Sequence, residues 1–239
     1  MSLLLAAGDP VIPDFGQGSS CERANGWFCT DWLHAHWGDT LQPALVQHIE
    51  LSLIAVGIGL VLASALALVG FRYRLLDPPI GLLADFLYTI PSLALFQLLV
   101  PLTGLTVTTV EIALVSYTLL ILYRNMITGL RTVPPEALEA ARGSGLTRVQ
   151  TFTRVELPLA LPAIIAGLRI ATVSTVSIAT VAAFVIPEGL GLPIFIALKQ
   201  DIFKTEILAA GLLVIALALF ADVVLVLAQR LLTPWTRVA

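Results

Sequence analysis

Residues 207–227 read ILAAGLLVIALALFADVVLVL, an apolar run interrupted by a single charge, Asp222. Each such run is close to the ~20 residues that an α-helix needs to cross a bilayer. Lipid offers no partners to unpaired backbone groups, so the runs predict an all-α membrane protein with five transmembrane helices. The five predicted spans are Leu51–Val69, Ile80–Val100, Val107–Tyr123, Leu159–Phe184 and Ile207–Leu227.

The composition supports a membrane protein over a soluble one. Of the 239 residues, 58% are hydrophobic and 12% are charged. That charged fraction is about half that of a typical soluble domain, too small to cover a water-exposed surface. The formal net charge of -3 gives no reason to expect nucleic acid as a partner.

The basic residues predict the orientation. Five spans place the two termini on opposite faces, and most arginines fall in segments that share one face. The positive-inside rule makes that face cytoplasmic. We therefore expect an extracytoplasmic tail over residues 1–49, a transmembrane domain over 50–232 and a cytoplasmic tail over 233–239. The arginines on the cytoplasmic face are Arg72, Arg74, Arg124, Arg131, Arg142, Arg148, Arg154, Arg230 and Arg237.

Cys21 and Cys29 flank an Asn25-Gly26 turn in the predicted extracytoplasmic tail. Disulfides persist outside the cytoplasm, so a short bridged loop is the favoured interpretation. Two unpaired thiols are the alternative. A metal site formed with His34 and His36 is disfavoured, because histidines in an aromatic-rich interfacial segment more often pack or lie at the surface. We predict no metal site and no cofactor.

The longest cytoplasmic connection, residues 131–158, predicts a first short helix. Pro134 and Pro135 end the third span, and proline suits the first position of a new helix. Strong helix formers follow at Glu139-Ala140-Ala141, until Gly143 and Gly145 end the helix.

A second short helix is predicted in the same connection. Thr147 and Gln150, three residues apart, have the spacing of a capping box. We expect this helix to end at Glu156-Leu157-Pro158. The connection is then a helix–glycine–helix hairpin on the cytoplasmic side of the membrane.

The residues of this hairpin resemble a known signature. Glu139-Ala140-Ala141 is followed after three residues by Gly145, after nine more by Val155, and after one more by Leu157-Pro158. This spacing resembles the signature loop of binding-protein-dependent ABC importer permeases, with Val155 in place of isoleucine. The resemblance implies a methionine-importer-permease-like fold, in which this loop is the coupling helix that docks on a cytoplasmic ATPase.

The family resemblance also implies the partners and the location. The chain would form half of a translocation pathway in a bacterial inner membrane. Two copies of an ABC ATPase subunit, an extracytoplasmic substrate-binding protein and a second permease, identical or paralogous, would complete the transporter. The chain itself would be non-catalytic. The two lysines, Lys199 and Lys204, agree with this, since neither follows a glycine as in a phosphate-binding loop.

Four further segments resemble the osmoprotectant branch of the family. They are Tyr88-Thr89-Ile90-Pro91-Ser92, Thr103-Gly104-Leu105, Tyr123-Arg124-Asn125 and Gly189-Leu190-Gly191. The implied substrate is a quaternary amine such as glycine betaine, choline or carnitine. An amino acid such as methionine is the alternative. Glu188 stands where a glycine often precedes the last triplet, which departs from the family pattern at the outer gate.

Within the spans, Pro91 is expected to kink the second helix, because proline removes a backbone hydrogen bond. Kinked helices often line a cavity, so we expect Tyr88, Thr89, Pro91, Ser92 and Gln97 to contribute to the pathway. A purely structural kink is the alternative.

Small residues recur every four positions from Ala163 to Ala183 and fit either an internal or a subunit interface. Asp85, Glu111 and Asp222 are the ionisable candidates in or near spans.

Two other classes fit the sequence less well. An ion-coupled secondary transporter commonly has duplicated halves, and no repeat is visible here. A membrane enzyme would need a nucleophile with a base or a set of metal ligands, and the sequence suggests neither.

Overall fold

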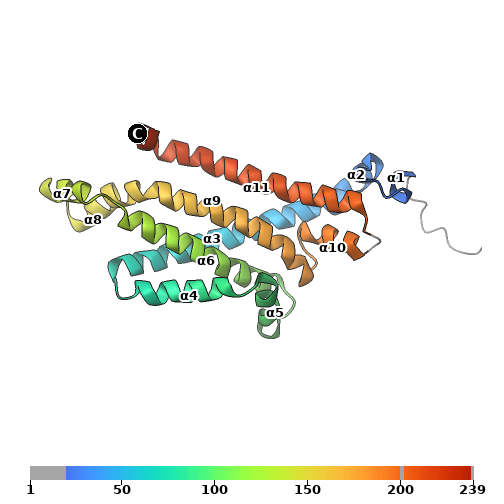
Figure 1. Ribbon diagram of the computed structural model, residues 1–239, viewed down its shortest axis with the longest axis horizontal. Coiled ribbons are helices and arrows are strands. Elements are labelled where there is room, and N and C mark those ends of the chain that lie inside the picture. Colours follow the sequence, from blue (N-terminus) through green and yellow to red (C-terminus); the bar gives the residue numbers. More distant parts are fainter. Residues whose placement is uncertain (1–19, 200–201, 238–239) are drawn as a thin grey trace, which may run out of the picture.

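The computed structural model describes residues 20–199 and 202–237, and every regular element within those ranges is helical. Residues 1–19 of the predicted outer tail, and 238–239 of the predicted inner tail, lie outside the described residues. The described residues form four long single helices, which run along the longest axis of the molecule (Figure 1). They are α3 (Gln42–Arg72), α6 (Val107–Arg131), α9 (Leu157–Val181) and α11 (Lys204–Leu232).

α6 is the centre of the bundle, between α3 and α9, and small residues allow this close packing. A Cβ atom at Gly59 of α3 would overlap the Thr118 side chain of α6, and one at Gly167 of α9 would overlap Asn125. A Cβ at Gly129 would lie 2.9 Å from that of Ala163. In lipid, such close backbone approach is a main source of helix association. The stripe of small residues in α9 therefore forms an internal interface with α6.

The predicted second span is broken rather than kinked. α4 (Asp77–Thr89) and α5 (Ser92–Thr103) meet at 99°. Ile90 is extended, with φ −70° and ψ 127°, because proline excludes the helical conformation from the residue before it. The described chain thus has four single helices able to cross a membrane, or five if the bent pair counts as one span.

The break between α4 and α5 exposes a backbone group that another helix satisfies. The hydroxyl of Tyr117 in α6 donates a hydrogen bond to the carbonyl of Ile90. The Tyr117 ring also packs edge-on against Tyr88, with centroids 5.7 Å apart. An unpaired carbonyl in lipid costs several kcal/mol, so this hydrogen bond stabilises the break.

The first span begins earlier than its hydropathy indicates. α2 (Thr30–His36), the π-helical η1 (Trp37–Leu41) and α3 form one continuous helical stretch, Thr30–Arg72. The helix begins well before Leu51, where the predicted span starts, because hydropathy marks the part of a helix in hydrocarbon and not where the helix begins. The predicted boundary at residue 49 therefore falls within α3.

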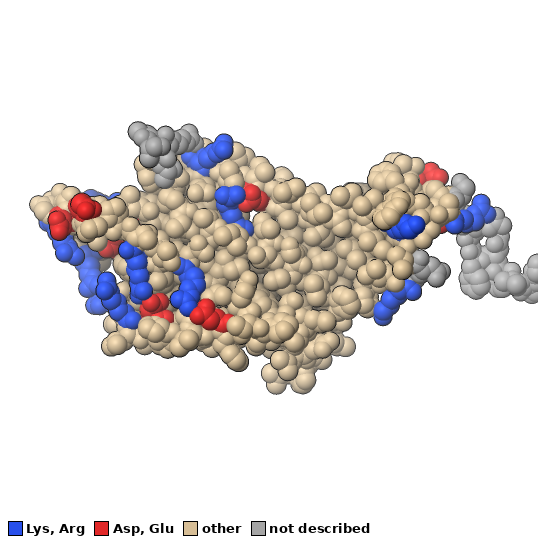
Figure 2. Space-filling view, in the orientation of Figure 1, with Lys and Arg blue, Asp and Glu red and all other residues tan. Residues whose placement is uncertain are grey.

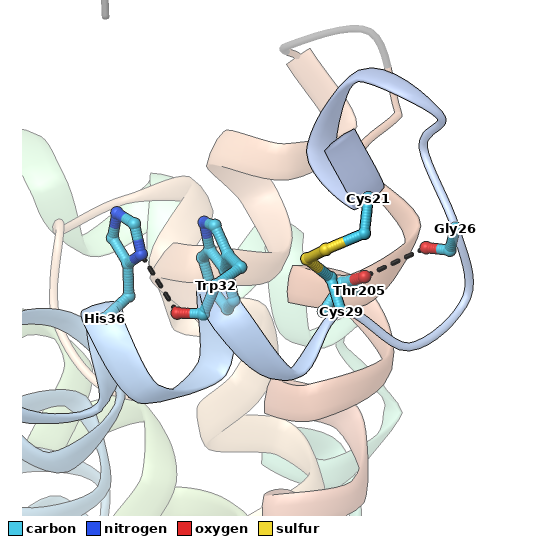
Figure 3. The surroundings of a disulfide bond; sticks show 6 residues. All are labelled: Cys21, Gly26, Cys29, Trp32, His36 and Thr205. Atoms are coloured by element: carbon cyan, nitrogen blue, oxygen red, sulfur yellow. Dashed lines mark hydrogen bonds between the residues drawn. A yellow bond between two sulfur atoms is a disulfide. The ribbon is translucent and has the colours of Figure 1, made fainter. Parts of the chain in front are cut away.

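The amino-terminal loop is fastened to the start of α11. Cys21 in α1 (Ser20–Arg23) and Cys29 form a disulfide with Cα atoms 5.6 Å apart (Figure 3). The Thr205 hydroxyl donates to the Gly26 carbonyl at 2.9 Å, inside this closed loop. Trp32 is buried beside the disulfide. The part of the chain that the structure describes contains no cluster of three metal-ligating side chains.

Candidate coupling loop and pathway elements

α7 (Pro135–Gly143) projects from the end of the bundle where α6 stops (Figure 1). Pro134 caps it in an extended conformation, and Pro135 occupies a first-turn position where its missing N–H costs nothing. Glu139 and Ala140 are exposed, whereas Ala141 is buried. The exposed pair is free to meet another protein, and the buried alanine lets α7 approach the chain beneath it.

Gly145 ends α7 through a Schellman motif, which explains why the signature has a glycine four residues after Ala141. The Leu146 N–H donates to the Ala141 carbonyl at 3.2 Å, and the Gly145 N–H donates to the Arg142 carbonyl at 3.0 Å. This pair of hydrogen bonds requires the residue at position 145 to have a left-handed backbone conformation. Gly145 has φ +75°, which only glycine adopts without strain.

The predicted capping box begins the next element. The Gln150 N–H donates to the Thr147 hydroxyl at 3.4 Å, and the Thr147 N–H donates to the Gln150 side chain at 2.9 Å. Both orphan donors at the start of α8 (Arg148–Thr151) are satisfied in this way.

The predicted end of this second helix at Pro158 was wrong. α8 continues through the π-helical η2 (Phe152–Glu156) directly into α9, so that 148–184 is one helical stretch. In a regular helix the ring of Pro158 would clash with the carbonyl four residues earlier. The wider π turn lies at that point and accommodates the ring.

The remaining signature residues lie at this junction. Val155 and Pro158 are half-buried and Leu157 is 38% exposed. They belong to the same helical rod that enters the bundle as α9. The loop is thus joined to α6 at one end and to α9 at the other, so a displacement of α7 is transmitted to both helices.

The predicted pathway residues lie on both sides of the α4–α5 break. Tyr88, Thr89, Pro91 and Gln97 are exposed, and Ser92 is half-buried. The hydroxyl of Thr89 donates to its own helix at the Phe86 carbonyl, at 2.7 Å. These five positions stay predictions for the pathway.

The sequence analysis did not predict the residues that hold the loop of Gly189, Leu190 and Gly191 in place. His48 is fully buried in α3 and accepts the Leu190 N–H at Nδ1, 3.2 Å away. The proton is therefore on Nε2, which donates to the Val176 carbonyl at 3.0 Å. The Gly189 N–H, in the same loop, donates to the Gln47 side chain at 3.1 Å. The only local signal of this role in the sequence is that Gln47 and His48 are adjacent and precede an apolar run.

Two of the three candidate carboxylates are paired. Arg169 of α9 donates two hydrogen bonds to Asp222 of α11, at 2.8 and 3.0 Å. Asp85 forms an ion pair with Arg124. Glu111 is buried, and neither of its carboxylate oxygens has a hydrogen-bond partner among the residues that the structure describes.

The chain is thus a membrane protein by its helices, which are long and apolar enough to cross a bilayer, with a helical hairpin at one end that is joined to α6 and α9. The chain belongs to the binding-protein-dependent transport system inner membrane component family, whose model matches residues 55–238. The predicted family and the predicted membrane location are thus confirmed.

Known relatives agree over most of the chain. It is 38% identical over 204 residues to the choline transport system permease protein OpuBB of Bacillus subtilis (strain 168), spanning 85% of this chain and 93% of that protein. It is 34% identical over 189 residues to the glycine betaine/carnitine/choline transport system permease protein OpuCB of the same organism, spanning 79% and 86%.

The fold is similar to that of a solved transporter. A chain of the inward facing MetNI methionine ABC transporter superposes with a TM-score of 0.65 at 19% identity, covering 79% of this chain and 95% of that chain. At that identity the likeness concerns the fold alone, and it confirms the predicted methionine-importer-permease-like architecture.

Proposed function

We propose that this chain is a permease subunit that forms half of the pathway for a quaternary-amine osmoprotectant and is driven by a separate ATPase through residues 131–158. The observation that carries the proposal is the geometry of this coupling loop. α7, which a Schellman motif ends at Gly145, presents Glu139 and Ala140 outward. The α8 segment that follows this turn is continuous with α9.

Coupling through this loop follows from its stiffness. The Schellman motif fixes how α7 ends, and the capping box fixes how α8 begins. A docked partner that displaces α7 therefore moves the ends of α6 and α9 instead of bending the loop. Glu139 and Ala140 would form the contact, while Ala141, Gly145, Val155, Leu157 and Pro158 would hold the shape of the loop.

The proposed assembly has two copies of a cytoplasmic ATPase subunit, a second permease and an extracytoplasmic substrate-binding protein. The arginines at the α7 end make that end cytoplasmic by the positive-inside rule. The exposure of α11 is consistent with contact to a second permease or to lipid, since only 6% of its most apolar window is buried inside the chain. The second permease is either identical or paralogous.

The relatives support glycine betaine, choline or carnitine as substrate, since the two above are named for their transport. Tyr88, Thr89, Pro91, Ser92 and Gln97 at the α4–α5 break are the proposed pathway positions. An amino acid such as methionine is the alternative substrate.

A double variant tests the coupling role. Glu139→Ala with Gly145→Pro removes an outward charge and imposes a negative φ where +75° is needed. We expect the protein to insert normally but to lose substrate uptake and ATPase co-purification. Normal uptake by this variant would overturn the proposal. Competition for uptake among betaine, choline, carnitine and methionine identifies the substrate.

A further inference from the structure

A large open cavity lies between the coupling loop and the ends of the membrane helices. Its walls are the end of α3, the start of α4, the end of α6 and the inner side of α7 to η2. The cavity volume is about 1430 Å³, larger than a typical small-molecule pocket. Figure 2 shows basic side chains gathered at this end of the molecule.

The cavity is lined by an excess of positive charge. Arg131 pairs with Asp77 at 2.7 Å, and Glu156 is the second carboxylate in the lining. The remaining basic side chains have no ion pair within the described ranges. These are Arg72, Arg74, Arg142 and Arg148. Glu156 interacts electrostatically with Arg142 and Arg148, but the arginines in the lining still outnumber its two carboxylates. Such an excess of guanidinium groups around one cavity favours an anion, and their planar donors suit phosphate.

The cavity lies at the level where hydrocarbon meets headgroups. Leu68 and Val69, at the end of the first apolar run, line it and are 49% and 39% exposed. Arg72 follows three residues later, with its guanidinium 5.1 Å from the ring centroid of Tyr73. Tyrosine and arginine at this depth are typical of a membrane interface. One ligand could therefore place acyl chains along α3 and a phosphate among the arginines.

Only one face of α7 lines the cavity. Leu138 and Arg142, four residues apart on the helix, line the cavity. Glu139 and Ala140 are exposed and do not line it. The face assigned to the ATPase thus points away from the cavity.

We propose that this cavity binds the phosphate headgroup of an anionic phospholipid from the cytoplasmic leaflet. Basic pockets between transmembrane helices on the cytoplasmic side recognise such headgroups by charge. The lipid would occupy the space between α3 and the coupling loop, and so contact the elements that the proposed ATPase drives.

The test uses the complete transporter, purified in micelles containing equal phosphatidylglycerol and phosphatidylcholine, with retained lipid counted by native mass spectrometry. We expect the unmodified protein to retain phosphatidylglycerol selectively. Each arginine removed should lower retention about fivefold. The variant Arg72→Gln/Arg142→Gln/Arg148→Gln should therefore retain about 100-fold less phosphatidylglycerol. The charge-preserving variant Arg72→Lys/Arg142→Lys/Arg148→Lys should keep most of it.

Arg154→Gln is the matched control, because Arg154 is exposed on the same loop but does not line the cavity. It should retain lipid as the unmodified protein does. A photoactivatable phosphatidylglycerol added to the unmodified protein should label residues 68–78 and 138–156. This second experiment does not depend on any variant being able to fold.

Any of the following results would overturn the inference. Equal retention by the glutamine variant, or labelling only elsewhere, would remove the lipid site. Release of the lipid by excess inorganic phosphate would assign the cavity to a soluble anion. If the glutamine variant lost the ATPase but retained lipid unchanged, the cavity would be assigned to an acidic segment of the ATPase. Lipid counting requires no transport, so its failure leaves the proposed function intact.

Discussion

The sharpest prediction concerns two glycines two residues apart, Gly143 and Gly145. A Cβ atom at either position would meet nothing within 4 Å, so an alanine has room at both. They differ in backbone conformation, since Gly143 is the last helical residue of α7 and Gly145 has φ +75°. Any difference between the two alanine variants therefore reports the left-handed turn and not crowding.

The magnitude follows from that conformation. An alanine at Gly145 costs about 1–2 kcal/mol in the left-handed region. At Gly143 the same change should stabilise the helix by up to about 1 kcal/mol. Because 1.4 kcal/mol is a factor of ten, Gly145→Ala should weaken ATPase binding by up to about 5- to 30-fold. Gly143→Ala should bind equally well or slightly better.

The assay is the affinity of the purified ATPase for each variant reconstituted in membranes, with uptake measured in parallel. Gly145→Asn is the rescue variant, because asparagine tolerates the left-handed region better than alanine does. It should fall between glycine and alanine. Equal affinities for Gly143→Ala and Gly145→Ala, or an asparagine variant worse than alanine, would refute the role of this turn.

Three other predictions concern the bundle. Tyr117→Phe leaves the backbone carbonyl at the α4–α5 break unpaired, so thermal denaturation should show a loss of about 1–3 kcal/mol; an unchanged Tm would contradict this. Gly191→Ala forces a Cβ into a backbone carbonyl of α9 and should abolish folded protein in size-exclusion chromatography, whereas Gly211→Ala, with open space, should not. Arg169→Leu alone should lower the Tm more than Arg169→Leu with Asp222→Leu, because the single change strands a carboxylate; the reverse order would show that the ion pair is not the reason both residues are present.

The sequence predicted those features whose signals are local. Apolar runs located the long helices, because lipid burial is a property of composition. The capping box at Thr147 and Gln150 was predictable from two residue types at fixed spacing. The glycine at 145 marked the end of α7 for a similar reason, since its left-handed backbone is a local requirement.

The features that the sequence did not predict depend on distant partners or on an irregular helical turn. Pro91 indicated a kink, but the 99° angle needs the Tyr117 hydroxyl from another helix to satisfy the freed carbonyl. Pro158 suggested a helix end, yet a π turn carries the chain past it. His48 is 142 residues from the loop that it holds, and no local pattern records that separation.

The central claim is that the outward face of α7 contacts the ATPase, and two neighbouring alanines test it most directly. Ala140 is exposed and Ala141 is 5% exposed, although they are adjacent in one helix. In the assembled transporter, a cysteine introduced by Ala140→Cys should form a covalent adduct with the ATPase through a short crosslinker. Ala141→Cys should form none. An intact complex without an adduct at Ala140→Cys, or with equal adducts at both positions, would contradict the account.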